Sequence, residues 1–267
     1  MNKKITIHTI KKLKSNKKPF SCITAYDSSM ATIIDSLEIP IILVGDSASM
    51  VMMGNDSTVP ITLEEMLVFV KSVSNNTKNS LVVADMPFMS YQESNAQAIK
   101  NAGFFIKNGG ANAVKIEGGC SVSDQINALV NYGIPVMGHI GLLPQSINQQ
   151  SGYNIQGKND ADANKLIKDA LAVQNSGAFS IVLEGIPSGL AKTITQSLEI
   201  PTIGIGAGPY CDGQIQVFHD IMGLFNSFVP RHTKQYINLT NHIKSSLNKY
   251  IDDVKNKKFP SKEHYQK

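Results

Sequence analysis

Residues 41–47 read IILVGDS: four apolar side chains, a glycine, an aspartate and a serine. An uninterrupted apolar run of this length is typical of a strand that is buried on both faces, as in a parallel sheet. Strands commonly end in polar loops, so Asp46 and Ser47 taken alone could be ordinary turn residues. Their meaning depends on whether other apolar runs in the chain end in the same way.

Seven further runs resemble this one. The eight predicted strands occupy residues 20–27, 41–47, 81–88, 112–119, 134–141, 179–186, 201–208 and 213–220. Several end in an acid or a histidine, namely Asp46, Asp85, Glu117, His139 and Glu184. Helical patterns separate the strands at 28–38, 62–73, 95–110, 121–132, 160–176 and 187–198, and a last one spans 233–255.

The alternation of strand and helix about eight times predicts an α/β protein with a (β/α)8 TIM barrel. An open doubly wound sheet is the alternative, but residues 25–31, AYDSSMA, lack the glycine-rich turn that it needs after its first strand. We predict a single domain over residues 1–267, with a basic, solvated N-terminal arm (1–18) and a C-terminal helix and tail (233–267). The apolar face of that helix is expected to cover the core.

Composition and charge exclude several classes of partner. The chain is 42% hydrophobic and 17% charged, and no apolar run approaches the length of a membrane span, so we expect a soluble protein with no membrane partner. The net charge of +4 comes without a basic stripe interleaved with aromatic residues, which argues against nucleic acid. Residues 1–18 lack the apolar segment of a secretory signal. Cys22, Cys120 and Cys211 have neither metal-type spacing nor the number for a disulfide framework, which favours the cytoplasm.

In a barrel, the carboxyl ends of all eight strands meet at one rim, where such proteins keep their chemistry. Asp46, Asp85, Glu117 and Glu184 would repel one another there unless a cation neutralised them. The sequence offers no pair of soft ligands, so a hard ion such as Mg²⁺, bound through oxygen, is expected. Asp46 and Asp85, on adjacent strands, are the natural pair of ligands.

Two further rim residues leave alternatives open. Lys115 lies two positions before Glu117, so both side chains share one face of their strand. Facing inward, Lys115 can contact an anion beside the metal; facing outward, the two form a surface pair. His139 could donate a hydrogen bond to a ligand or be a core histidine. Arg231 is the only arginine, so guanidinium groups are nearly absent as anion ligands.

Seven blocks of sequence, in order, resemble the ketopantoate hydroxymethyltransferase family, also called 3-methyl-2-oxobutanoate hydroxymethyltransferases, which catalyse the first committed step towards pantothenate. The blocks are VGDS with GNDSTVPITLEEM, ADMPFMSYQ, VKIEGG, GHIGLLPQS with GYNIQGK, VLEGIP, IPTIGIGAGPYCDGQIQVFHDIMGL, and FVPRHTKQY. The resemblance runs from about Thr9 to the tail FPSKEHYQ. It implies a barrel of the phosphoenolpyruvate/pyruvate-binding type.

The resemblance also implies a ligand set and a reaction. Mg²⁺ would be bound through Asp46 and Asp85, with Glu117 beside the metal. The family transfers a hydroxymethyl group from 5,10-methylenetetrahydrofolate to 3-methyl-2-oxobutanoate, giving 2-dehydropantoate and tetrahydrofolate. Together with the residues, this predicts a magnesium-stabilised enolate. Members commonly form homo-oligomers, often decamers.

Residue by residue, the resemblance implies that Lys115 contacts the 2-oxo acid, that Ser47 and Asp85 also bind substrate, and that His139 matches a histidine near it. Glu184 matches the general base. The chain departs from the family pattern at several positions, which include Ala48, Ser49, Asn55, Leu143, Ser151 and Gln216.

Two other functions remain as alternatives. A magnesium-dependent lyase of the phosphoenolpyruvate/pyruvate barrel group, acting on a 2-oxo or 2-hydroxy acid, would use similar chelation. Such lyases usually carry a cysteine in a Lys-Cys-Gly-type loop, and none of the three cysteines lies in one. A non-catalytic binding or structural protein would have no need of the rim carboxylates.

Overall fold

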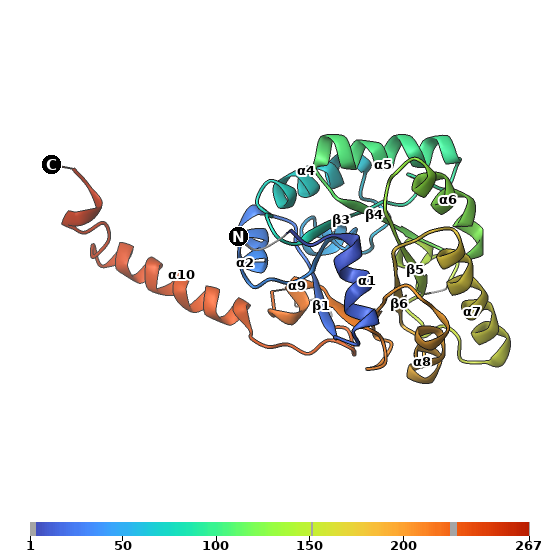
Figure 1. Ribbon diagram of the computed structural model, residues 1–267. Coiled ribbons are helices and arrows are strands. Elements are labelled where there is room, and N and C mark those ends of the chain that lie inside the picture. Colours follow the sequence, from blue (N-terminus) through green and yellow to red (C-terminus); the bar gives the residue numbers. More distant parts are fainter. Residues whose placement is uncertain (1–3, 151, 225–228, 267) are drawn as a thin grey trace. The chain divides into compact units, whose positions relative to one another are not determined.

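The computed structural model describes residues 4–150, 152–224 and 229–266. In this part of the chain, eight parallel strands close into a barrel in sequence order (Figure 1). The strands are β1 (Phe20–Thr24), β2 (Ile41–Val44), β3 (Leu81–Asp85), β4 (Ala113–Glu117), β5 (Val136–Gly141), β6 (Ser180–Glu184), β7 (Thr202–Ile205) and β8 (Gly213–Gln216). The predicted TIM barrel and all eight predicted strands are confirmed.

The strands alternate with helices that surround the barrel (Figure 1). The longer ones are α2 (Ser28–Ser36), α4 (Leu63–Ser74), α5 (Asn95–Gly109), α6 (Ser123–Asn131), α7 (Asp160–Asn175) and α8 (Ser188–Ser197). Local sequence fixes where several of them begin: Asp27 accepts the Met30 N–H at the start of α2, and Thr62 and Glu65 form a reciprocal capping box at the start of α4. Three short helices follow strands at the carboxyl end, namely α3 (Ala48–Val51) after β2, η1 (Cys120–Val122) after β4 and η2 (Pro144–Ser146) after β5.

Alternation along each strand separates the apolar core from the rim. In β3, Leu81 and Val83 belong to the hydrophobic core cluster, which contains inward-facing residues of all eight strands. Because side chains alternate between the two faces of a strand, Asp85 follows them on the inner face, at the end of the strand. The interior is therefore apolar towards the beginning of the strands and polar at their carboxyl ends.

The N-terminal arm is more ordered than its lysines suggest. Helix α1 (Ile7–Ser15) buries Ile10 completely, in the same core cluster as the first residues of β1, β2 and β3. Lys14 Nζ lies 2.9 Å from Asp212 Oδ2 and donates to the carbonyl oxygen of Thr195 at 3.0 Å. The prediction of a solvated arm is wrong for this helix, because its apolar side packs over the end of the barrel at which the strands begin.

The chain divides into two compact units, Met1–Val217 and Phe218–Lys267. The second contains α9 (Phe218–Ile221), α10 (Leu239–Lys255) and η3 (Lys262–His264). No residue of α10 is buried, so the prediction that its apolar face covers the core is not confirmed. The single-domain organisation stays a prediction. No helix in the described ranges is long and apolar enough to cross a membrane.

Candidate active site

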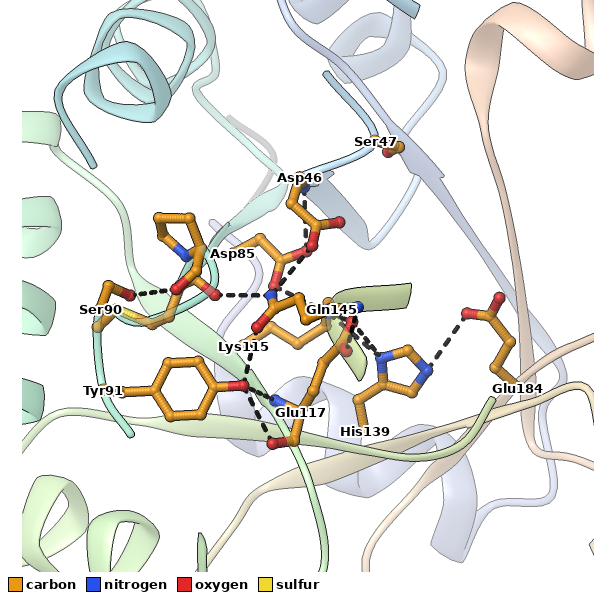
Figure 2. A network of polar contacts seen from close by, with 12 residues as sticks. Asp46, Ser47, Asp85, Ser90, Tyr91, Lys115, Glu117, His139, Gln145 and Glu184 are labelled. Atoms are coloured by element: carbon orange, nitrogen blue, oxygen red, sulfur yellow. Dashed lines mark hydrogen bonds and ion pairs between the residues drawn. The ribbon is translucent and has the colours of Figure 1, made fainter. Parts of the chain in front are cut away.

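The polar ends of β2, β3, β4, β5 and β6 converge at the carboxyl rim, as the sequence predicts (Figure 2). Asp46, Asp85, Lys115, Glu117 and His139 are all buried. Glu184 is the more accessible member, with 16% of its side chain exposed. The site is therefore a set of charged groups held together out of water, which is costly unless the charges compensate one another.

Asp46, just after β2, lies in direct contact with Asp85, at the end of the neighbouring β3. The backbone N–H of Asp46 donates to Asp85 Oδ2 at 3.1 Å. Burial, followed by the charges of Asp85 and Glu117, raises the pKa of Asp46 well above its ordinary value. Burial also raises the pKa of Asp85, although the neighbouring Lys115 works in the opposite direction. Both carboxylates thus lie where a bound cation would lower the free energy of the ionised state.

Lys115 faces into the barrel, which excludes the outward-facing alternative. Its Nζ lies 2.8 Å from Asp85 Oδ1 and 3.5 Å from Glu117 Oε1. Burial lowers the pKa of Lys115, but the charges of Asp85, Glu117 and Asp46 outweigh it and raise the pKa above its ordinary value. Burial likewise raises the pKa of Glu117, yet Lys115 and His139 bring it below its usual range. Lys115 is therefore a buried cation at the centre of the acids.

His139 lies between Glu117 and Glu184 and contacts both. Its Nδ1 lies 3.3 Å from Glu117 Oε1, and its Nε2 lies 3.2 Å from Glu184 Oε2. Burial and the charge of Lys115 lower the pKa of His139, but its contacts with Glu117 and Glu184 outweigh them and raise the pKa to about 9. His139 is a buried residue that links the two acids (Figure 2), and its Nδ1 also lies 3.3 Å from Lys115 Nζ.

Two glycines allow the backbone after β4 and at the end of β5 to approach its neighbours closely. Gly141, at the end of β5, has φ +100°, and a Cβ atom there would overlap the carbonyl oxygen of Glu184. A Cβ atom on Gly119 would overlap the side chain of Asp169, whose Oδ1 accepts the Cys120 N–H at 2.9 Å. Gly141 therefore lets the end of β5 lie against Glu184, and Gly119 lets the loop after Glu117 pack on α7.

Ser47 lies beside Asp46 at the start of α3, with its Oγ 2.8 Å from Tyr26 Oη. Two of the departures from the family pattern contact each other in the loop that follows: Asn55 Nδ2 donates to Ser49 Oγ at 3.1 Å. Ser49 Oγ in turn donates to the carbonyl oxygen of Ser57 at 2.7 Å. This pair closes the loop internally. Ser151 lies outside the described residues.

The chemistry of the donor atoms fits a hard cation. Asp85 Oδ1 and Glu117 Oε1 are buried carboxylate oxygens that already face one cation, Lys115 Nζ, at 2.8 and 3.5 Å. No three His, Cys, Asp or Glu side chains among the described residues are arranged to hold a metal ion by themselves. Mg²⁺ needs only one or two carboxylates, because water and substrate oxygens complete its shell, so Asp46 and Asp85 suffice chemically.

Sequence reasoning missed three residues of this network. Gln145 in η2 and Tyr91 in the loop after β3 are buried among the acids, and Tyr26 after β1 contacts Ser47. Gln145 and Tyr91 lie outside the strands, where no periodicity marks a residue as inward-facing. The only available signal was their presence in the blocks ADMPFMSYQ and GHIGLLPQS.

Comparisons with known proteins agree on one family. A family model described as ketopantoate hydroxymethyltransferase matches residues 4–262. A 3-methyl-2-oxobutanoate hydroxymethyltransferase of Clostridium beijerinckii is 51% identical over 261 residues, which cover 98% of this chain and 95% of the relative. One of the same name from Dehalococcoides mccartyi is 52% identical, over 96% of this chain and 92% of the relative.

Solved structures share the barrel at much lower identity. A phosphonopyruvate hydrolase, in complex with oxalate and Mg²⁺, superimposes with a TM-score of 0.62 at 10% identity, over 97% of this chain and 93% of that chain. A phosphoenolpyruvate phosphomutase from Streptomyces platensis subsp. rosaceus gives a TM-score of 0.63 at 12% identity, over 94% of this chain and 88% of that one. These likenesses establish the fold alone, a closed barrel of parallel strands surrounded by helices.

Proposed function

The chain belongs to the ketopantoate hydroxymethyltransferase family of pantothenate-pathway enzymes, and from this premise we propose its full reaction. A hydroxymethyl group passes from 5,10-methylenetetrahydrofolate to 3-methyl-2-oxobutanoate, giving 2-dehydropantoate and tetrahydrofolate. The observation that carries the proposal is the convergence of two aspartates, a buried lysine and a more accessible glutamate at one rim. An acidic metal pair beside a cation and a base is the arrangement that deprotonation next to a carbonyl group needs.

Asp46 and Asp85 would hold Mg²⁺, with Glu117 beside it. When bound, Mg²⁺ would supply Lewis-acid polarisation of the 2-oxo acid and offset the charge of the carboxylates. The phosphonopyruvate hydrolase that shares the fold was solved with oxalate and Mg²⁺, and the proposal is compatible with that structure.

Lys115, Ser47, His139 and Asp85 would bind and orient 3-methyl-2-oxobutanoate. Lys115 is a buried donor with a full positive charge, so its Nζ suits an anionic oxygen of the substrate. The Ser47 hydroxyl, held by Tyr26, offers a neutral hydrogen bond. His139 would provide a second positive charge, between Glu117 and Glu184.

Glu184 would be the general base. Its carboxylate removes the proton from C3 of the 2-oxo acid, and the enolate that results is stabilised by the positive charges of Lys115 and His139. C3 then bonds to the methylene carbon carried by the folate, and both bonds from that carbon to the folate nitrogens break. Water supplies the hydroxyl oxygen, and the two nitrogens take up the proton removed from C3 and one proton from the water, which gives tetrahydrofolate. Glu184 suits this role because it is the most accessible acid of the group, at the end of β6.

The test separates proton removal from folate. With Mg²⁺ and no folate, the protein should exchange the C3 hydrogen of 3-methyl-2-oxobutanoate into deuterated water, followed by proton NMR. Glu184→Gln should slow the exchange by about 10²- to 10⁴-fold, the usual contribution of a positioned general base. Substrate affinity should change little, because the glutamine keeps the shape of the side chain.

Glu199→Gln is the matched control, since Glu199 is exposed and lies before β7, at the opposite end of the barrel. It should exchange at the rate of the unmodified chain. Full exchange by Glu184→Gln would mean that another residue of the rim is the general base. No exchange by the unmodified chain would reject the enolate, and a lyase of the alternative group has no reason to exchange this hydrogen selectively.

We further propose a homo-oligomer, a decamer by family resemblance, that acts in the cytoplasm. The exposed apolar side chains of α10, such as Ile243, Leu247 and Ile251, are the feature that supports assembly. Three free cysteines are compatible with a reducing compartment. Light scattering should give about ten times the 29.0 kDa of one chain, and a monomeric mass would reject assembly. Cell fractionation tests the compartment.

A further inference from the structure

A buried glutamine joins the ends of the three strands that carry the proposed metal-site carboxylates. The Gln145 side chain donates from Nε2 to Asp46 Oδ2 at 3.0 Å and to the carbonyl oxygen of Met86 at 2.9 Å. The backbone N–H of Gln145 donates to Glu117 Oε2 at 3.1 Å. Asp46 follows β2, Met86 follows β3 and Glu117 ends β4, so one residue connects the ends of all three strands. Figure 2 shows Gln145 between Asp46 and Glu117.

The neighbours of the Gln145 amide determine which of its two ends is the oxygen and which is the nitrogen. Its Nε2 faces two acceptors, whereas its Oε1 accepts from Tyr91 Oη at 3.0 Å and lies 3.5 Å from Gln92 Nε2. The reverse orientation would set an oxygen against a carboxylate and a carbonyl oxygen, with no proton between them. Gln145 is therefore a fixed donor to Asp46.

Tyr91 holds this arrangement in place through contacts with both Gln145 and Glu117. Besides its contact with Gln145 Oε1, its hydroxyl accepts the Glu117 N–H at 3.0 Å and lies 3.1 Å from the Glu117 carbonyl oxygen. Both Tyr91 and Gln145 are almost completely buried. Buried polar networks in which each member has a partner hold their side chains in one arrangement.

The type of residue at position 145 matters as well. A lysine or arginine there would neutralise Asp46 and compete with a cation for it. A carboxylate would add a further negative charge to the cluster, and an apolar residue would leave Asp46 Oδ2 and the Met86 carbonyl oxygen without this donor. An amide fixes one oxygen of Asp46 while the net negative charge of the carboxylate remains available to a cation.

We propose that Gln145 is a positioning residue that orients Asp46 and Glu117 for cation binding, with Tyr91 as its support. The inference rests on the proposed function, since it takes Asp46 as a ligand of the metal. Groups that hold a ligating carboxylate in place typically change metal affinity by about 10- to 100-fold when they are replaced.

The experiment measures metal binding without substrate or turnover. Mn²⁺ alone is titrated into the full chain, and the electron paramagnetic resonance signal of free Mn²⁺ gives the Kd. Gln145→Met keeps the length of the side chain and the backbone donor to Glu117 but removes the amide, so Mn²⁺ should bind about 10- to 100-fold more weakly. Tyr91→Phe should show a smaller loss, and the double variant should lose less than the two effects combined, because both act through one network.

Gln150→Met is the matched control. Gln150 belongs to the same loop, but its amide meets only backbone: Oε1 accepts the Leu143 N–H at 3.0 Å, and Nε2 donates to the Gly141 carbonyl oxygen at 3.1 Å. Its Kd for Mn²⁺ should stay within about twofold of the unmodified chain. An equal loss in this control, or an unchanged Kd in a folded Gln145→Met, overturns the proposal. If Gln145→Met does not fold, Tyr91→Phe decides, and an unchanged Kd there overturns it too.

Two further measurements keep this inference separate from the proposed function. Asp85→Asn should abolish tight Mn²⁺ binding; if it does not, the proposed metal site fails whatever Gln145 does. In the C3 exchange reaction, Gln145→Met should need more metal but approach the unmodified rate at saturation, because Glu184 is intact. A rate that stays low at saturating metal contradicts a positioning role through Asp46.

Discussion

Lys115 brings a positive charge into the barrel interior, within reach of Asp85 and Glu117. Lys115→Met should lower the stability of the metal-free chain by about 3–5 kcal/mol, because it leaves buried carboxylates without their partner. It should also weaken binding of the 2-oxo acid by about 10- to 100-fold, the effect of losing a hydrogen bond to a charged group. Denaturant unfolding and calorimetric titration measure the two effects.

Lys165 supplies the control for this prediction. It pairs with Asp169 at 2.9 Å, but its side chain is 74% exposed. Lys165→Met should therefore change the free energy of unfolding by less than about 1 kcal/mol. If Lys115→Met were equally mild, the lysine would not be the compensating charge of the site.

His139 gives a prediction about pH. In the metal-free chain its pKa is raised to about 9 by Glu117 and Glu184, against the lowering effects of burial and Lys115. The imidazole should remain protonated at pH 7.5, and NMR of the ring nitrogens shows this directly, with His139→Gln to assign the signal. Because the folded-state pKa lies above the unfolded one, the stability that this residue contributes is present below about pH 6.5 and lost as pH rises through 9. A ring that titrates near pH 6.5 would contradict the contacts described.

At the scale of elements, Asp35 of α2 holds the turn that leads into β3. Its carboxylate accepts the backbone N–H groups of Lys78, Asn79 and Ser80 at 2.8–3.2 Å. Burial alone would raise the pKa of Asp35, but these donors bring it below its ordinary value. Asp35→Asn should lower the free energy of unfolding by about 2 kcal/mol at pH 7, because the buried Ser80 N–H and the partly buried N–H groups of Lys78 and Asn79 lose a charged acceptor.

The pH dependence identifies the cause. The folded-state pKa of Asp35 is depressed, so its contribution is full above the unfolded pKa and disappears as pH falls through the folded value. The difference between Asp35→Asn and the unmodified chain, measured by denaturant unfolding, should shrink below about pH 4. Asp124→Asn, an exposed residue in the first turn of α6, should show little difference at any pH. A constant difference down to pH 3 would point to packing instead of charge.

Strands explain why much of the site could be predicted. The alternation of side chains puts Lys115 and Glu117 on one face, and parallel strands bring Asp46, Asp85 and Glu184 to one rim. Neither rule needs tertiary information. Gln145 and Tyr91 follow no such rule, because their orientation comes from loop geometry and from hydrogen bonds to residues distant in the sequence.

At the scale of the whole molecule, periodicity identified amphipathic segments but not what they contact. The face of α10 that contains Ile243 and Leu247 was correctly read as apolar, yet both side chains are exposed in the single chain. In α1 the lysines obscured a short apolar spacing at Ile7, Ile10 and Leu13, which packs on the barrel core. What an amphipathic face covers depends on the rest of the fold or on another molecule, and neither is encoded locally.

The position of helix α1 has a consequence for how substrates reach the site and how products leave it. Because the helix packs over the end of the barrel where the strands begin, we expect substrates to enter and products to leave at the opposite end, by the rim. The proposed binding groups for the 2-oxo acid are buried, so a folate bound above them would block the small molecule's path. We expect compulsory order, with 3-methyl-2-oxobutanoate first in and 2-dehydropantoate last out. Product-inhibition kinetics should then show 2-dehydropantoate competing with the 2-oxo acid alone, and random-order patterns would indicate a second route of access to the site.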